Sequence, residues 1–163
     1  MSVRRLQQRV PTARALLVAV LRRHRLAFHK AGRDGSAKCD ALSSGLDEDA
    51  VHGVLYRMDA RDRPQLDVVE GLGCGYERKK VTLWVADEKE LSAFTYCATH
   101  IDATLRPYPW YIEHVLRGAR EHNLPDHYLA KIAAVPTLDD PDPQRHAMEL
   151  DIYPSSIPLD HPE

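Results

Sequence analysis

Residues 76–98 read YERKKVTLWVADEKELSAFTYCA and contain two stretches that are typical of β-strands. The first stretch, residues 76–86, is rich in Val, Thr, Leu and Trp, and the second covers residues 91–98. The polar residues 87–90 separate the two stretches as a turn would. We therefore expect a β-hairpin in this part of the chain.

Helices are expected after the hairpin, and a strand and a short helix before it. Apolar residues recur at helical spacing from residue 109 to residue 122, and residues 126–135 continue as a second helix. Before the hairpin, residues 51–56 indicate a strand. Pro64 suits the first turn of a helix that follows it, and Gly71 suits a left-handed residue after its end.

The N-terminal part adds one more helix and more strand. Residues 3–10 predict a helix that ends before Pro11, because proline cannot continue the pattern. Residues 14–30 predict strand, residues 32–35 a turn, and residues 43–50 a surface loop. Helices and strands are thus mixed along the chain.

The composition is that of a soluble globular domain, with 163 residues, 44% hydrophobic and 28% charged. The apolar run at residues 13–21 is shorter than the ~20 residues of a membrane span and shows no signal-peptide pattern. We therefore expect a cytoplasmic protein with no membrane partner. The three cysteines contain no C-x-x-C pair, so we expect bystander thiols and no metal site.

Two regions are expected on composition, a folded domain at residues 1–136 and a tail at residues 137–163. The part after Val135 holds six of the eleven prolines and an acidic excess, with little periodicity. We expect this Pro-rich acidic tail to be irregular.

Charge is distributed unevenly along the chain. Residues 1–40 hold ten Lys or Arg and two Asp, which gives +8, whereas residues 41–163 carry −10. A basic segment can bind nucleic acid, but no aromatic stacking pattern accompanies these bases. A solvated face, or one that attracts anionic small molecules, is the favoured reading, and we expect no nucleic-acid partner.

Three blocks, in order, resemble the γ-glutamylcyclotransferase family. They are GVLY at residues 53–56, LDVVEGLGCGY at residues 66–76, and PYPWYIEHVLRGAREHNLP at residues 107–125. A fourth block, RDGSAK at residues 33–38, is similar to bacterial AIG2-like members. The resemblance implies an α+β fold, a small mixed or antiparallel sheet curled like a barrel with packed helices. It also implies an enzyme, without a cofactor, that releases 5-oxoproline from a small γ-glutamyl substrate, a reaction of glutathione metabolism.

The resemblance makes Glu70, the glutamate of the E-G motif, the catalytic residue. A γ-glutamyl amide cyclises when its α-amino group attacks its own γ-carbonyl, but that amine is mostly protonated at neutral pH. One carboxylate can remove this proton and later protonate the leaving amine. Without the surrounding motifs, Glu70 would read as an ordinary solvent-facing helix residue.

Tyr76, Tyr96 and Tyr111 match tyrosines that line the family's substrate pocket, where hydroxyl groups can orient the substrate without adding charge. Tyrosines at such places are also common as core or rim residues. Trp110 is expected as a packing anchor. The nearby histidines do not have the i, i+4 spacing of a helical metal site.

The family's N-terminal Tyr-Gly-Ser-Asn turn, whose N–H groups hold the glutamyl part of the substrate, has no counterpart in this sequence. Either the sequence starts at an internal methionine, which we favour, or the turn has been lost. Loss of one oxyanion donor lowers a rate ~10²- to 10³-fold. The main rival to an enzyme is therefore a catalytically silent γ-glutamyl-binding protein. A missing strand would also leave a neighbouring strand exposed, which predicts that the protein forms a homodimer or covers that strand with its tail.

Overall fold

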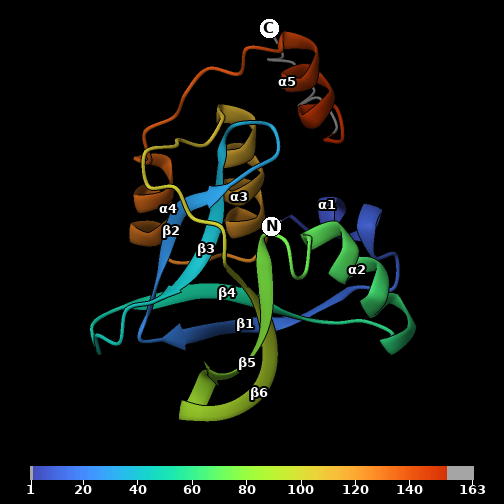
Figure 1. The fold of residues 1–163 in the computed structure, drawn as a ribbon. Coiled ribbons are helices and arrows are strands. Elements are labelled where there is room, and N and C mark those ends of the chain that lie inside the picture. The colour runs from blue at the N-terminus through green and yellow to red at the C-terminus, as the bar shows by residue number, and fades with distance from the viewer. Residues whose placement is uncertain (1, 154–163) are drawn as a thin grey trace, which may run out of the picture.

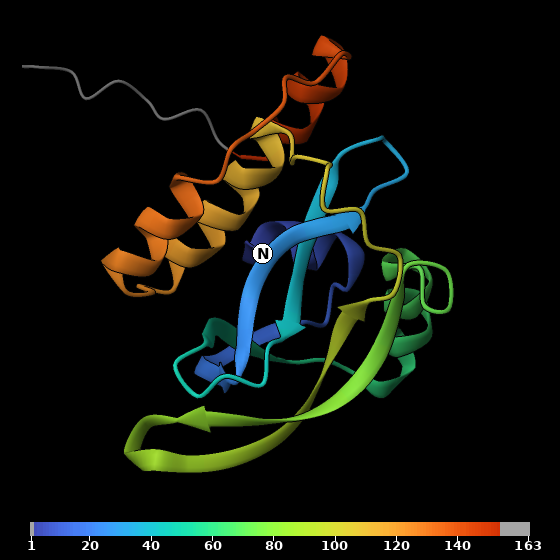
Figure 2. The ribbon, with the colours of Figure 1, turned by 60° about the vertical axis from the view of Figure 1, so that its left-hand side comes forward.

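The computed structural model describes residues 2–153 and shows an α+β fold with curled antiparallel sheets, as expected (Figures 1 and 2). Four strands form one sheet in the order β4-β1-β5-β6, and β2 and β3 form a second sheet. The strands are β1 (Arg14–Arg22), β2 (His24–Ala31), β3 (Ala37–Ser43), β4 (Ala50–Arg57), β5 (Tyr76–Val85) and β6 (Lys89–Ala98).

The predicted hairpin at residues 76–98 is confirmed as β5 and β6. The two strands pair in continuous register from Tyr76↔Ala98 to Val85↔Lys89. The hairpin joins the rest of its sheet through one registered pair, Val20↔Trp84, whereas β1 pairs with β4 over most of its length. Its long curved strands therefore extend beyond the other strands, as Figure 2 shows.

The expected helices before residue 136 are present. They are α1 (Val3–Arg9), α2 (Arg63–Glu70), α3 (Pro109–Glu121) and α4 (Asp126–Ala133), with short 3-10 turns η1 (Ala60–Asp62) and η2 (Ala86–Glu88). α2 has Pro64 in its first turn and ends at Gly71, whose φ of 72° is left-handed. Glycine adopts this conformation without the steric cost of a Cβ atom, so α2 stops directly after Glu70.

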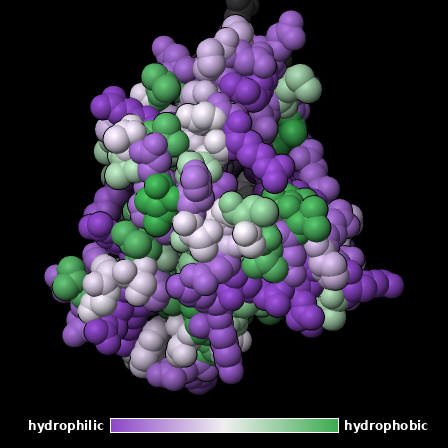
Figure 3. Space-filling model, in the orientation of Figure 1, coloured by the Kyte–Doolittle hydropathy of each residue, from purple (hydrophilic) through white to green (hydrophobic). Residues whose placement is uncertain are grey.

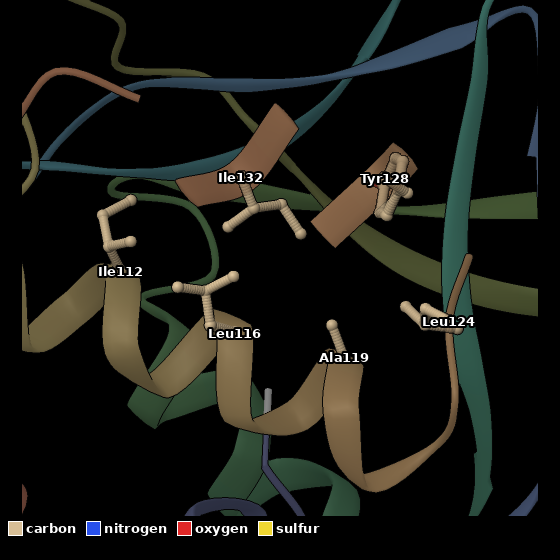
Figure 4. Packing of buried hydrophobic residues seen from close by; sticks show 6 residues of the cluster. All are labelled: Ile112, Leu116, Ala119, Leu124, Tyr128 and Ile132. Atoms are coloured by element: carbon tan, nitrogen blue, oxygen red, sulfur yellow. The ribbon is translucent and has the colours of Figure 1, made fainter. Parts of the chain in front are cut away.

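Two hydrophobic clusters hold the helices on the strands. Figure 4 shows the first, which is formed by side chains of α3, of α4 and of the turn between them: Ile112, Leu116, Ala119, Leu124, Tyr128 and Ile132. Leu26 and Phe28 of β2 pack against this cluster. The second cluster, Val10, Ala13 and Leu66, joins the segment after α1 to α2. Burial of apolar area in these clusters fixes both pairs of helices.

The expectation of an irregular tail at residues 137–163 is wrong for residues 143–150, which form the helix α5 (Pro143–Leu150). Asp142 caps this helix by accepting hydrogen bonds from the N–H groups of Gln144 and Arg145, both at 3.0 Å. Proline fits the first turn because its missing N–H has no intrahelical partner there. The expectation for residues 154–163 lies outside the described residues.

The surface mixes polar and apolar groups. On the face in Figure 3, hydrophobic residues occur in small separate groups among hydrophilic ones. None of the helices in residues 2–153 is long and apolar enough to cross a membrane.

Candidate functional site

A cavity of about 800 Å³ lies between the helices and the strands. Both hydrophobic clusters border it, since Leu66 and Tyr56 line it from one side and Ala119 and Ile132 from the other. Its walls come from α1, α2, α3, α4 and the strands β2, β3, β4, β5 and β6. A cavity of this size can hold a ligand as large as a dipeptide.

Glu70 lines this cavity at the end of α2, and its side chain is only 17% exposed. The Arg9 guanidinium donates a hydrogen bond from Nη1 to Oε1 of Glu70, at 3.2 Å. Within residues 2–153, Oε2 of Glu70 has no hydrogen-bond partner. One oxygen is thus held by Arg9 and the other is available to a ligand.

The loop at residues 71–75 continues from Glu70 and is folded tightly on itself. The carbonyl oxygen of Gly71 accepts hydrogen bonds from the N–H groups of Cys74 and Gly75 at 2.9 and 3.0 Å. Gly73 has a φ of 82° and donates its N–H to the carbonyl oxygen of Tyr76. The glycines of the EGLGCGY motif therefore let this loop close beside the catalytic candidate.

The structure brings Tyr76, Tyr96 and Tyr111 to the same cavity as Glu70. Their hydroxyl groups bind other protein groups. Tyr76 donates to the carbonyl oxygen of Cys39 at 2.8 Å, and Tyr96 donates to Oδ1 of Asp67 at 2.6 Å. The Tyr96 bond ties β6 to α2, the helix that carries Glu70. A role in orienting substrate stays a prediction for all three.

Cys39 is a cavity residue whose contacts the sequence did not indicate. Its N–H donates to the Tyr111 hydroxyl oxygen at 3.0 Å, and that hydroxyl donates to Sγ of Cys39 at 3.0 Å. Burial raises the pKa of the Cys39 thiol and of the Tyr111 hydroxyl. Both groups are therefore neutral at physiological pH, so Cys39 supports Tyr111 and is poorly suited to act as a nucleophile.

Cationic side chains dominate the charge of the cavity. Among the described residues, five cations line it against the single carboxylate of Glu70: Arg5, Arg9, Lys30, Arg33 and Lys38. All five belong to the basic residues 1–40, so part of the positive charge of that segment lies on the cavity wall; attraction of anionic small molecules stays a prediction.

Lys38 is the most enclosed of the lysines in this group. Its Nζ lies 2.7 Å from Oδ2 of Asp34 and 4.7 and 4.9 Å from the ring centroids of Trp110 and Tyr111. Burial lowers the pKa of Lys38, although Asp34 opposes this shift. Lys38 thus forms an internal ion pair over an aromatic wall.

The segment after α4 returns to α1 and α3, and its side chains bind residues of these two helices that line the cavity. Nδ1 of His114 lies 2.7 Å from the hydroxyl of Tyr153, and its Nε2 lies 3.0 Å from Oε2 of Glu149. Arg5 also donates to Oε2 of Glu149. Trp110 is 2% exposed and donates its indole N–H to Asp140 at 2.6 Å, so it is the packing anchor that the sequence predicted.

The Glu149 contacts predict that α5 binds less tightly in acid. The hydrogen bond from His114 has the largest effect on the pKa of Glu149 and lowers it; burial opposes this shift, and the hydrogen bond and charge of Arg5 add to it, so that the pKa falls from 4.5 to about 2. A lowered pKa stabilises the fold fully above pH 4.5, and this contribution is lost as the pH falls from 4.5 towards 2.

We expect Glu149→Gln to lower the free energy of unfolding at pH 7, and the difference from wild type to shrink by about pH 3. Urea unfolding followed by circular dichroism at both pH values measures this difference. Glu77→Gln, on an exposed side chain of β5, is the control. A difference for Glu149→Gln that is equal at both pH values would contradict the proposed ion pairing.

No group of three or more His, Cys, Asp and Glu side chains within residues 2–153 is arranged to hold a metal ion.

Comparison with known proteins gives relatives of one kind. Residues 50–132 match the AIG2-like family. The γ-glutamylcyclotransferase of Mus musculus is 31% identical over 88 residues, which are 53% of this chain and 46% of that protein. The γ-glutamylcyclotransferase of Homo sapiens is 27% identical over 139 residues, covering 83% and 73% of the two chains. The chain spans about half the length of the mouse relative that it matches.

Two solved structures are similar over most of their length. An uncharacterized protein from Homo sapiens, known from a crystal structure refined as an ensemble, has a TM-score of 0.77 and 26% identity, covering 85% of this chain and 83% of that one. A structure named γ-glutamyl cyclotransferase has a TM-score of 0.81 and 23% identity, covering 92% of both chains. The second similarity concerns the fold alone.

Proposed function

We propose that this chain, which belongs to the AIG2-like family, is a γ-glutamylcyclotransferase-type enzyme. It would release 5-oxoproline from a γ-glutamyl amino acid, peptide or amine by intramolecular aminolysis. The single observation that carries the proposal is the position of Glu70, which among residues 2–153 is the only carboxylate lining a cavity rich in cations and tyrosines.

Glu70 is suited to both proton transfers of this reaction. Oε2 is available to accept a proton from the α-ammonium group of the substrate, after which the free amine attacks the γ-carbonyl carbon. The attacking nitrogen loses a second proton as the new lactam C–N bond forms and the original amide C–N bond breaks. The two protons pass to the leaving nitrogen, one of them by way of Glu70, and the leaving group departs as an ammonium ion. No water is consumed, and the protein must also hold the substrate in a folded conformation with its amine beside the γ-carbonyl carbon.

The surroundings of Glu70 support this role. Arg9 fixes one carboxylate oxygen, and the Tyr96–Asp67 hydrogen bond fixes the helix that carries Glu70. Burial raises the pKa of Tyr76 and of Tyr96, and the charge of Glu70 adds to both shifts, so each tyrosine remains a neutral donor near neutral pH. The cations of the cavity match the carboxylates that γ-glutamyl compounds carry.

Mass spectrometry of reactions with γ-glutamylalanine tests the proposal. We expect the wild-type protein to release 5-oxoproline and alanine. N-acetyl-γ-glutamylalanine is the matched control, because its blocked amine cannot attack the γ-carbonyl. Binding of γ-glutamylalanine without any release would contradict the enzyme and favour the silent binding protein.

A further inference from the structure

Lys30 lies against the loop that follows Glu70. It is near the end of β2, just after a shift in the register between β2 and β3. A Cβ atom at residue 75 would be 2.9 Å from Cε and 3.0 Å from Nζ of Lys30, so the end of this side chain occupies the space that the glycine leaves open. Nζ also lies 5.1 Å from the centroid of the Tyr76 ring. The ammonium group therefore lies at the cavity wall, beside Gly75 and Tyr76.

A second cation, Arg33, lies close to Lys30 in the turn between β2 and β3. Burial, and then the charge of Arg33, lower the pKa of Lys30, whereas the charges of Glu70 and Asp34 raise it. The two cations are thus near enough to repel each other, and Lys30 is near enough to Glu70 to be stabilised by it. Both line the cavity, with Arg33 at its exposed side.

The other three cavity cations already have partners. Arg5 pairs with Glu149, Arg9 with Glu70, and Lys38 with Asp34. Among residues 2–153, neither Lys30 nor Arg33 forms a salt bridge with a carboxylate. Two neighbouring cations on a cavity wall that form no salt bridge with a carboxylate of residues 2–153 are suited to bind an anionic group of a ligand.

We propose that Lys30 and Arg33 form an anion subsite for a carboxylate on the leaving half of the substrate. The inference rests on the proposed function. The reacting carbonyl must lie beside Glu70, and the leaving group must reach solvent; Arg33 is a cavity residue that is itself exposed to solvent. The enzyme would then prefer γ-glutamyl amino acids and peptides to γ-glutamyl amines, which lack this carboxylate.

Two matched substrates test the subsite, γ-glutamylalanine and γ-glutamylethylamide, which differ only in the carboxylate of the leaving group. We expect Lys30→Met to lower kcat/KM for γ-glutamylalanine by about 10- to 100-fold, the effect of one charge-assisted hydrogen bond. The change for γ-glutamylethylamide should stay below about threefold. Arg33→Gln should act in the same direction, with a smaller effect because Arg33 is more exposed.

Lys80→Met is the control, because Lys80 is an exposed residue of β5 that does not line the cavity. It should leave both substrates unchanged. If Lys30→Met lowers kcat/KM equally for both substrates, Lys30 contacts the glutamyl half. If it lowers kcat/KM for neither substrate, Lys30 does not bind the substrate. Either result would overturn the proposal.

Binding separates a failure of the subsite from a failure of the enzyme. Calorimetric titration of Glu70→Gln with each substrate requires no turnover, and we expect tighter binding of γ-glutamylalanine than of γ-glutamylethylamide. Adding Lys30→Met should abolish this preference. If wild type turns over neither substrate, the proposed function fails, and the titration still decides the subsite. Equal binding of the two substrates, or no binding of either, counts against the anion subsite.

Discussion

Replacing Glu70 with Gln should reduce 5-oxoproline release from γ-glutamylalanine by about 10²- to 10⁴-fold, the usual effect of losing a general acid–base group. The amide keeps an oxygen that can accept the Arg9 hydrogen bond but cannot take up a proton from the substrate ammonium. The fold should therefore be retained. Single-turnover rates from mass spectrometry measure the effect.

Glu77→Gln is the matched control for this change, because Glu77 is exposed and pairs with Lys79 on the surface of β5. It should retain the wild-type rate. Circular dichroism and thermal unfolding of both variants would exclude a loss of structure. A folded Glu70→Gln protein with the wild-type rate would contradict the assignment of Glu70.

Replacing Asp40 with Ala should produce the largest loss of stability that we predict, about 2–4 kcal/mol, because two buried polar groups would lose their acceptor. Asp40 is 4% exposed; its Oδ1 accepts the N–H of Ala98 at 2.8 Å and its Oδ2 lies 2.9 Å from Nε2 of His29. The side chain thus joins β3 to β6 across the two sheets. Chemical unfolding measures the loss, and Tm should fall by about 2–4 °C for each kcal/mol.

Asp102→Ala is the control that separates the loss of hydrogen bonds from the effect of burial. Asp102 also accepts two hydrogen bonds, from the N–H and the hydroxyl of Thr104, but it lies at the surface, where water can replace them. Its effect should be much smaller. Asp40→Asn, which keeps one acceptor oxygen, should fall between Asp40→Ala and wild type. Equal effects of Asp40→Ala and Asp102→Ala would contradict the argument from burial.

Elements with a clear strand or helix pattern, or with residues that mark their beginning and end, were predictable from the sequence. The β5–β6 hairpin has the composition of strands around a polar turn, and α2 has both Pro64 at its start and Gly71 at its end. These signals act locally, so they survive in the folded protein. The family resemblance then supplied the curled α+β arrangement.

The elements that depend on distant contacts were missed. β3 has no alternating pattern because the inward-facing Asp40 is polar and is satisfied by groups from β2 and β6. α5 is short and rich in polar residues, and Glu149 binds Arg5 of α1 and His114 of α3. Only the Asp142-Pro143 pair, a cap followed by a first-turn proline, indicated this helix in the sequence.

The candidate site was predictable in part. The EGLGCGY motif indicated Glu70 and Tyr76, but periodicity cannot say which of the basic residues 1–40 face the cavity. That depends on the curl of β2 and on the approach of α1 to α2, which bring Lys30 and Arg9 to Glu70. The expected homodimer and the expected domain boundary near residue 136 stay predictions.

The most direct test of the central claim is a reaction of the wild-type protein with γ-glutamylalanine in water enriched in ¹⁸O. In intramolecular aminolysis the nucleophile is the substrate's own amine, so the account predicts 5-oxoproline without ¹⁸O. Hydrolysis would use solvent as the nucleophile. Glutamate carrying one ¹⁸O atom as the main product would contradict the account.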